Sequence, residues 1–328
     1  MKQKMLSYNE ALDIVNRKIN AIIYPENPRN LYAPIQYILS LKGKKVRPVL
    51  SLLACNLYKE DISEVISPAL AWEIFHNFTL MHDDLMDKAE VRRGKPVVYK
   101  VWDENTAILS GDAMLILSYQ YMADTSSARL KPLLDLFSKT AMEICAGQQY
   151  DMEFEKRLNV SVDEYIEMIR LKTAVLLGAA LKTGAIIGDA MLSDAENLYD
   201  FGMNIGLAFQ IKDDLLDVYG NPDVFGKQIG GDILCNKKTF LLINALNLAA
   251  GNDKEILLQQ ITSDNIDSKT KIKTVTGIYN GLNLKAIAED KMNEFYQKAL
   301  HSLHLVQVDD WKKTILIDFA KELMNRES

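Results

Sequence analysis

Proline and glycine are scarce in this chain, with 8 and 16 residues among 328. No proline occurs between Pro132 and Pro222, and none follows Pro222. Because proline removes a backbone donor and clashes inside a helix, such long proline-free stretches favour helices. The sequence therefore predicts an all-α protein, and its 48% of hydrophobic residues predicts a large globular core.

Other absences exclude further classes of protein. The three cysteines, Cys55, Cys145 and Cys235, have no zinc-site spacing, and their odd number is typical of a reduced, intracellular protein. A net charge of -6 argues against nucleic acid as a partner. No uncharged stretch is long and apolar enough to span a bilayer, and charged residues interrupt the first twenty positions where a signal peptide would be apolar. We therefore expect a cytoplasmic protein without a transmembrane segment.

No internal repeat or low-complexity linker divides the chain, so we expect a single domain over residues 1–328. Ser161 with Glu164, and Ser193 with Glu196, are typical of capping boxes that start helices. Hydrophobic periodicity predicts helices over residues 6–23, 31–57, 62–88, 104–124, 129–157, 162–187, 194–219, 237–249, 253–262, 268–303 and 309–326.

The most informative feature is an acidic pattern that occurs twice. The first copy reads Asp83-Asp84-Leu85-Met86-Asp87, and the second reads Asp213-Asp214-Leu215-Leu216-Asp217. On a helix, the first and last aspartates of each copy lie four residues apart and share one face. Like charges at this spacing repel unless cations bridge them, and Mg²⁺ is the natural match for clustered carboxylate oxygens. One copy alone could be a solvated acidic helix end, but two copies in similar settings favour metal binding.

Basic residues lie near both acidic clusters, which indicates a polyphosphate ligand held together with Mg²⁺. The adjacent Arg92 and Arg93, beside Gly94 and Pro96, suit recognition of a diphosphate. The other candidates flank the two clusters, and they are Lys44, Arg47, Lys172, Lys227 and Lys237.

Two other kinds of site find little support. The sequence has no Walker-type glycine loop and no Gly-x-Ser-x-Gly nucleophile elbow. Glu73 and His76 form one Glu-x-x-His pair, but a ferritin-like di-iron site needs a second pair, which the other histidines do not supply.

Taken together, these motifs resemble those of the trans-isoprenyl diphosphate synthases, also called polyprenyl synthetases. The resemblance covers about 200 residues in the family's order. It rests on segments 43–48 (GKKVRP), 83–87, 92–96 (RRGKP), 172–173 (KT), 209–214 (FQIKDD), 226–227 (GK) and 237–239 (KKT). Val97 and Tyr99 depart from the Thr and His that the family often has after the Arg-Arg-Gly-x-Pro segment, and Lys42 replaces a glycine.

The resemblance implies the isoprenoid synthase fold, in which long helices surround one central cavity, and usually a homodimer. It implies Mg²⁺-dependent head-to-tail condensation of isopentenyl diphosphate with an allylic diphosphate. Three Mg²⁺ ions, with Mn²⁺ as an alternative, are expected on Asp83, Asp87 and Asp213, with Asp84 and Asp217 as supporting acids.

The resemblance also implies roles for the polar residues. The residues expected to bind the allylic diphosphate are Arg92, Lys172, Lys227 and Lys237. Those expected to bind isopentenyl diphosphate are Lys44, Arg47, His76 and Arg93. Thr173 and Gln210 are expected to aim oxygen dipoles at the carbocation.

Product length is expected to depend on the helix that carries the first acidic cluster. Thr79 lies one turn before Asp83, with Phe78 beside it, and Phe75 and Trp72 lie deeper. In the family that the motifs resemble, an aromatic ring at the position of Phe78 is typical of short products of C15 or C20, and the small Thr79 favours C20. Phe78 could alternatively be a packing residue of the core.

Two alternative functions remain open from the sequence. A class I terpene cyclase also uses an Asp-rich helix and Mg²⁺, but it needs no isopentenyl site. A non-catalytic subunit of a heteromeric prenyl synthase would have lost an acidic motif, whereas this chain keeps both.

Overall fold

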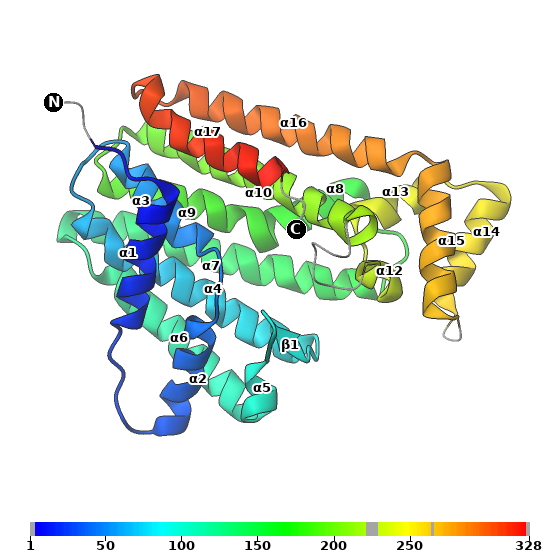
Figure 1. Ribbon diagram of the computed structural model, residues 1–328, viewed down its shortest axis with the longest axis horizontal. Coiled ribbons are helices and arrows are strands. Elements are labelled where there is room, and N and C mark those ends of the chain that lie inside the picture. The colour runs from blue at the N-terminus through cyan, green and yellow to red at the C-terminus, as the bar shows by residue number, and fades with distance from the viewer. Residues whose placement is uncertain (1–3, 221–228, 264–265, 326–328) are drawn as a thin grey trace. The chain divides into compact units, whose positions relative to one another are not determined.

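The computed structural model describes residues 4–220, 229–263 and 266–325 (Figure 1). Within these ranges helices dominate, and the strands form one short antiparallel hairpin of β1 (Val91–Arg92) and β2 (Lys95–Pro96). The prediction of an all-α protein is thereby confirmed. None of the helices described is long and apolar enough to cross a membrane.

The chain divides into two compact units, each built from separate stretches of sequence. Unit 1 comprises Met1–Lys139, Ala179–Tyr199 and Val306–Leu316. Unit 2 comprises Thr140–Gly178, Asp200–Leu305 and Ile317–Ser328. The first acidic cluster therefore belongs to unit 1 and the second to unit 2. A single domain over residues 1–328 stays a prediction.

Unit 1 is organised around α4 (Ile66–Met86), which packs against α6, α3 and α2. Its other elements, whole or in part, are α1 (Tyr8–Asn20), α2 (Arg29–Ser40), α3 (Val46–Asn56), η1 (Ser63–Val65), the hairpin, α5 (Val98–Val101), α6 (Glu104–Ala123), α7 (Ser127–Glu155), α9 (Val175–Ile187), α10 (Leu192–Tyr219) and α17 (Asp310–Asn325).

An aromatic cluster fills the core of unit 1. Trp72 and Phe75 of α4 are fully buried, and their rings contact that of Phe137 at centroid distances of 4.9 and 5.3 Å. The indole N–H of Trp72 donates to the Thr183 hydroxyl at 3.0 Å, so this buried polar group keeps a partner. The position of α4 is thus fixed by large side chains that have little freedom to repack.

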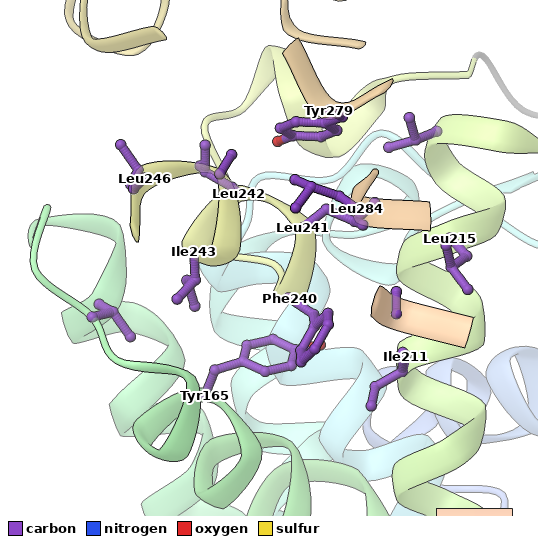
Figure 2. Packing of buried hydrophobic residues seen from close by; sticks show 14 of the residues in the cluster. Tyr165, Ile211, Leu215, Phe240, Leu241, Leu242, Ile243, Leu246, Tyr279 and Leu284 are labelled. Atoms are coloured by element: carbon purple, nitrogen blue, oxygen red, sulfur yellow. The ribbon is translucent and has the colours of Figure 1, made fainter. Parts of the chain in front are cut away.

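Unit 2 contains α8 (Val162–Ile169), the π-helical turn η2 (Arg170–Ala174), and the remaining parts of α7 and α10. It also contains α12 (Gly231–Leu234), α13 (Phe240–Leu248), α14 (Gly251–Thr262), α15 (Ser268–Gly281) and α16 (Leu284–Leu305). Figure 2 shows part of its core, where Tyr165 of α8 lies beside Phe240 of α13. Ile211 and Leu215 enter the same core from α10, immediately around the second acidic cluster.

Two of the predicted long helices are each broken in the structure. The range 31–57 forms α2 and α3, because residues 41–45 leave the helical path and Lys45 adopts a left-handed φ of 45° before α3. The range 268–303 forms α15 and α16, with Asn283 at a φ of 55° between them. Non-glycine residues rarely adopt this conformation, so neither break follows from hydrophobic periodicity.

The predicted helix starts at the two serines had different outcomes. Ser161 caps α8 in a complete capping box with Glu164, as predicted. The capping box predicted at Ser193 is wrong, because α10 begins at Leu192 and Ser193 therefore lies inside the helix. Asp194 instead holds the first turn of α10, accepting hydrogen bonds from the Tyr58 hydroxyl and from the Gln307 backbone N–H.

Candidate active site

The first acidic cluster occupies the C-terminal end of α4, a 21-residue helix. Asp83 and Asp84 lie in its last turn, and Asp87 is the C-cap, whose N–H donates to the Asp83 carbonyl at 2.9 Å. The C-terminus of a helix carries partial negative charge, which makes carboxylates unfavourable there, and the last turn of α4 has no basic residue. The placement conflicts with helix electrostatics unless cations bind, and such conflicts mark functional positions.

Asp84 is the buried member of this cluster, and its partner is Arg92 of β1. The Nε of Arg92 lies 2.8 Å from both carboxylate oxygens of Asp84, and one Nη lies 2.6 Å from Oδ1. The same guanidinium is 3.9 Å from Asp83. Burial raises the pKa of Asp84 above its ordinary value, although the hydrogen bonds from Arg92 oppose this rise. Asp84 therefore anchors Arg92 beside the more accessible Asp83.

The hairpin that carries Arg92 has a two-residue turn made of Arg93 and Gly94, both at positive φ. Positive φ at both turn residues is typical of a type I′ turn, whose twist matches that of the two strands. The guanidinium of Arg93 lies over Gly43, where an added Cβ would stand 2.9 Å from its Cζ. Because Gly43 has no side chain, the guanidinium of Arg93 can lie against the loop that contains Lys44.

A cluster of cationic groups surrounds this loop. Burial lowers the pKa of Arg47 to about 10, and its Nε is a buried atom without a hydrogen-bond partner in the described structure. Burial, and then the charges of Arg47 and Arg93, hold the pKa of His76 well below its ordinary value, so His76 is neutral. Like charges held this close favour an anionic ligand. Arg47, His76 and Arg93, three of the four residues expected to bind isopentenyl diphosphate, thus lie close together. The fourth, Lys44, is exposed, and its backbone carbonyl accepts a hydrogen bond from the Tyr8 hydroxyl at 2.7 Å.

A buried ion pair supports this cluster, and sequence reasoning did not find it. Lys45 Nζ lies 3.1 Å from Glu73 Oε1, with the two side chains only 4% and 1% exposed. Lys45 also donates to the Leu39 carbonyl, and the Asn77 amide donates to Glu73 Oε1 at 2.8 Å. The pair links the loop of Lys44, which leads into the helix of Arg47, to the helix of His76. Its signal in the sequence is a lone acid within the apolar stretch of α4.

In unit 2 the second acidic cluster lies in the last two turns of α10, which again has no basic residue in its last turn. Asp214 is buried, and its carboxylate accepts hydrogen bonds from the Tyr165 hydroxyl at 2.6 Å and the Phe240 N–H at 2.9 Å. Burial raises the pKa of Asp214 to about 7. Asp214 therefore ties α10 to α8 and α13, and Asp213 beside it is partly exposed.

Asp217 accepts hydrogen bonds from the backbone of residues 230 and 232. Its carboxylate accepts the Asp232 N–H at 3.0 Å, and its carbonyl accepts the Gly230 N–H at 2.6 Å. Burial, and then the neighbouring Asp232, raise the pKa of Asp217 to about 6, whereas Lys237 opposes this rise. Lys237 thus lies near the second cluster, as expected, while Lys227 falls outside the described residues.

Lys172 and Thr173 lie in the π-helical turn η2. Lys172 Nζ is 2.6 Å from Asp151 of α7, and the Thr173 hydroxyl is 3.4 Å from the side-chain oxygen of Gln210. The structure therefore brings Lys172, Thr173 and Gln210 together. Asp151 was missed because nothing in its local sequence distinguishes it from a solvated acid.

The residues expected to set product length lie along α4 in unit 1. The Phe78 ring is partly buried, and it contacts Phe75 at 5.5 Å and His82 at 4.8 Å between centroids. Thr79 donates its hydroxyl to the His76 carbonyl of its own helix at 2.8 Å. Phe78 thus lies between the acidic end of α4 and its buried aromatic core.

No group of three or more acidic, histidine or cysteine side chains stands ready to hold a metal ion among the described residues. Each unit by itself nevertheless presents carboxylates at the negative end of a helix. Aspartate oxygens at such positions are suitable ligands for a hard divalent cation.

Residues 28–279 match the family model described as Polyprenyl synthetase. The chain is 34% identical over 315 residues to the geranylgeranyl diphosphate synthase of Methanosarcina mazei, covering 95% of each chain. It is 38% identical over 273 residues to the geranylfarnesyl diphosphate synthase of Natronomonas pharaonis, covering 78% of this chain and 80% of that one. The fold matches a crystal structure of geranylgeranyl pyrophosphate synthase with a TM-score of 0.93 and 40% identity, covering 99% of this chain and 100% of that one. The isoprenoid synthase fold expected from the sequence is confirmed.

The buried pair in unit 1 gives a first testable prediction. Glu73→Gln keeps the shape of the side chain but leaves Lys45 charged and buried without its counter-ion, which destabilises a protein by about 3–5 kcal/mol. The double variant Lys45→Met, Glu73→Gln removes both charges, and we expect it to recover most of this loss. Chemical denaturation of the three proteins measures the effect.

The exposed pair of Lys131 and Asp135, with side chains 82% and 65% exposed, provides the control. Asp135→Asn should change stability by less than about 1 kcal/mol, because solvent screens such pairs. A Glu73→Gln protein as stable as the Asp135→Asn protein would contradict the anchoring role.

Proposed function

Because this chain belongs to the polyprenyl synthetase family, we propose that it condenses isopentenyl diphosphate head to tail with an allylic diphosphate. The observation that carries this proposal is the repeated placement of an aspartate cluster at the negative end of a long helix, in α4 and again in α10. Dimethylallyl, geranyl and farnesyl diphosphates are the candidate allylic substrates.

Asp83, Asp87 and Asp213 are the proposed Mg²⁺ ligands, with three ions expected when substrate is bound and Mn²⁺ as a possible substitute. Asp84 and Asp217 support them, since each already holds a neighbouring group by hydrogen bonds. Bound Mg²⁺ supplies positive charge to the diphosphate oxygens, which makes the diphosphate a better leaving group.

The basic residues divide between the two substrates. Arg92, Lys172, Lys227 and Lys237 are proposed to neutralise the allylic diphosphate. Arg47, His76, Arg93 and Lys44 are proposed to hold isopentenyl diphosphate, for which the cations of Arg47 and Arg93 near Glu73 provide the charge. The neutral state of His76 suits a hydrogen-bond donor beside arginines.

The proposed reaction begins with charge separation in the allylic diphosphate. The allylic C–O bond breaks, its electron pair leaves with the diphosphate, and an allylic cation remains. The Thr173 hydroxyl donates to Gln210, so its own oxygen lone pairs are available to face that cation. The double bond of isopentenyl diphosphate attacks to form the new C–C bond, and the proton lost from the adjacent carbon passes to the released diphosphate.

We also propose that the enzyme is a cytoplasmic homodimer. In support of a dimer, α6 exposes a row of large apolar residues, with Ile108, Leu109 and Ile116 exposed by 44%, 60% and 62%. Exposed apolar rows of this kind are typical of surfaces covered by another subunit.

A single assay tests the reaction. The purified chain is incubated with Mg²⁺, labelled isopentenyl diphosphate, and C5, C10 or C15 allylic diphosphate in turn, and its products are sized by chromatography. We expect products of C15 to C20. A chain that ignores isopentenyl diphosphate but consumes an allylic diphosphate would be a terpene cyclase, and a chain inactive alone would be a non-catalytic subunit.

The metal assignment predicts that Asp83→Ala and Asp213→Ala each lower turnover by on the order of 100-fold or more, because the developing diphosphate charge loses its counter-charge. Steady-state turnover at saturating Mg²⁺ is the measurement, with circular dichroism to show that the fold is retained. Asp135→Ala, on the surface of α7, is the control and should keep wild-type turnover. Variants within a few-fold of wild type would refute the assignment.

The position of Phe78 predicts that Phe78→Ala lengthens the product, since removing the ring opens space next to Phe75 along α4. Product chain length by chromatography is the readout. Phe295→Ala, which removes a buried ring from the core of unit 2, shows whether loss of packing alone has this effect. Unchanged product length in Phe78→Ala, or equal lengthening in Phe295→Ala, would exclude Phe78 as the floor.

A further inference from the structure

The π-helical turn η2 interrupts the regular α-helical backbone between α8 and α9 in unit 2. It spans Arg170–Ala174 between α8 and α9, and it carries both Lys172 and Thr173. A π turn widens the helix by one residue and is tolerated only where the surroundings support it, commonly at functional sites. The residues packed against η2 therefore have to hold this turn in place.

On one side, the turn rests directly on the backbone of α7 at Gly147. A Cβ at Gly147 would lie 2.3 Å from the backbone nitrogen of Lys172 and 2.7 Å from its Cα. Four residues later on α7, Asp151 binds the Nζ of the same lysine at 2.6 Å. Gly147 and Asp151 share one face of the helix, so α7 contacts both the backbone and the side-chain end of Lys172.

On another side, α10 makes a contact of the same form. A Cβ at Gly206 would lie 2.6 Å from the Cα of Ala174 and 2.9 Å from its Cβ. Four residues later, Gln210 lies 3.4 Å from the Thr173 hydroxyl. Each helix thus places a glycine against the turn and, one helical turn further on, a polar group against a side chain of that turn.

We propose that Gly147 and Gly206 are positioning residues, which seat η2 so that Lys172 and Thr173 meet the reacting allylic substrate. This inference rests on the proposed function, and it adds two residues that contact no substrate themselves. The atoms that a new methyl group would meet belong mainly to backbone, so the turn itself has to shift. Ordinary contact requires a shift of about 1 Å at Gly147, and a misplacement of about 1 Å can cost on the order of 100-fold in rate.

The test uses Gly147→Ala and Gly206→Ala in the full chain. Alanine favours a helix over glycine, so any loss comes from the close approach and not from helix propensity. We expect kcat for condensation to fall by about 10-fold or more, while KM for isopentenyl diphosphate stays within about twofold, because that substrate is held by unit 1 residues.

Two further glycines provide matched controls. A Cβ at Gly184 would lie 2.2 Å from the Ser51 carbonyl in unit 1, so Gly184→Ala is equally crowded, but the atoms it meets belong to α3 and not to η2. Gly277 on α15 has no atom within 4 Å of an added Cβ. We expect Gly184→Ala to lower the melting temperature but keep kcat, and Gly277→Ala to change neither. An equal loss of kcat in Gly184→Ala would overturn the proposal.

A readout independent of turnover separates this proposal from the proposed reaction. Acetylation of lysines by an amine-reactive ester, followed by mass spectrometry, reports how well Asp151 protects Lys172. In Gly147→Ala we expect faster modification of Lys172, with Lys182, paired to Glu196 at 2.6 Å in unit 1, as an unchanged internal reference. If the wild-type chain lacks condensation activity, the proposed reaction is wrong. If a folded Gly147→Ala protein keeps both its kcat and the protection of Lys172, the positioning role of Gly147 is refuted.

Discussion

Negative charge concentrated where a helix is already negative is the constraint on which this molecule depends. In α4 and α10 alike, three aspartates gather near the C-terminal end, and no lysine or arginine in the last turn offsets them. The surrounding structure reduces this repulsion because at least one acid of each cluster is held by internal hydrogen bonds. Asp84 takes a bidentate contact from Arg92, and Asp214 is buried against Tyr165 and the Phe240 N–H. The acids left accessible are then available to divalent cations, and the large aromatic cores beneath keep the two helix ends from relaxing.

The sequence predicted the helices that have unbroken periodicity and standard ends. The α6 helix was expected at 104–124 and spans 104–123, and Ser161 caps α8 as its capping box indicated. The breaks before α3 and before α16 escaped prediction because each depends on a non-glycine residue in a left-handed conformation, at Lys45 and Asn283. Tertiary packing imposes these conformations, so local propensity carries no sign of them.

In the candidate site, too, some residues could be predicted from the sequence and others could not. The aspartates, Lys172, Thr173 and Gln210 could be identified from motifs, because their chemistry is carried by short segments of sequence. Their partners could not. Glu73 and Asp151 come from separate elements, and only the fold shows that they hold Lys45 and Lys172. The π turn was not predicted either. The predicted helix over 162–187 has the correct limits, and η2 interrupts it only in its interior.

The short hairpin after α4 joins two neighbouring arginines that serve different neighbours. Arg92 turns toward Asp84, while Arg93, in the tight turn, lies over Gly43. The hairpin has two residues per strand and a two-residue turn, so the backbone positions of the two arginines are coupled. A substitution that alters the turn at Arg93 would therefore also shift Arg92 and its contact with Asp84.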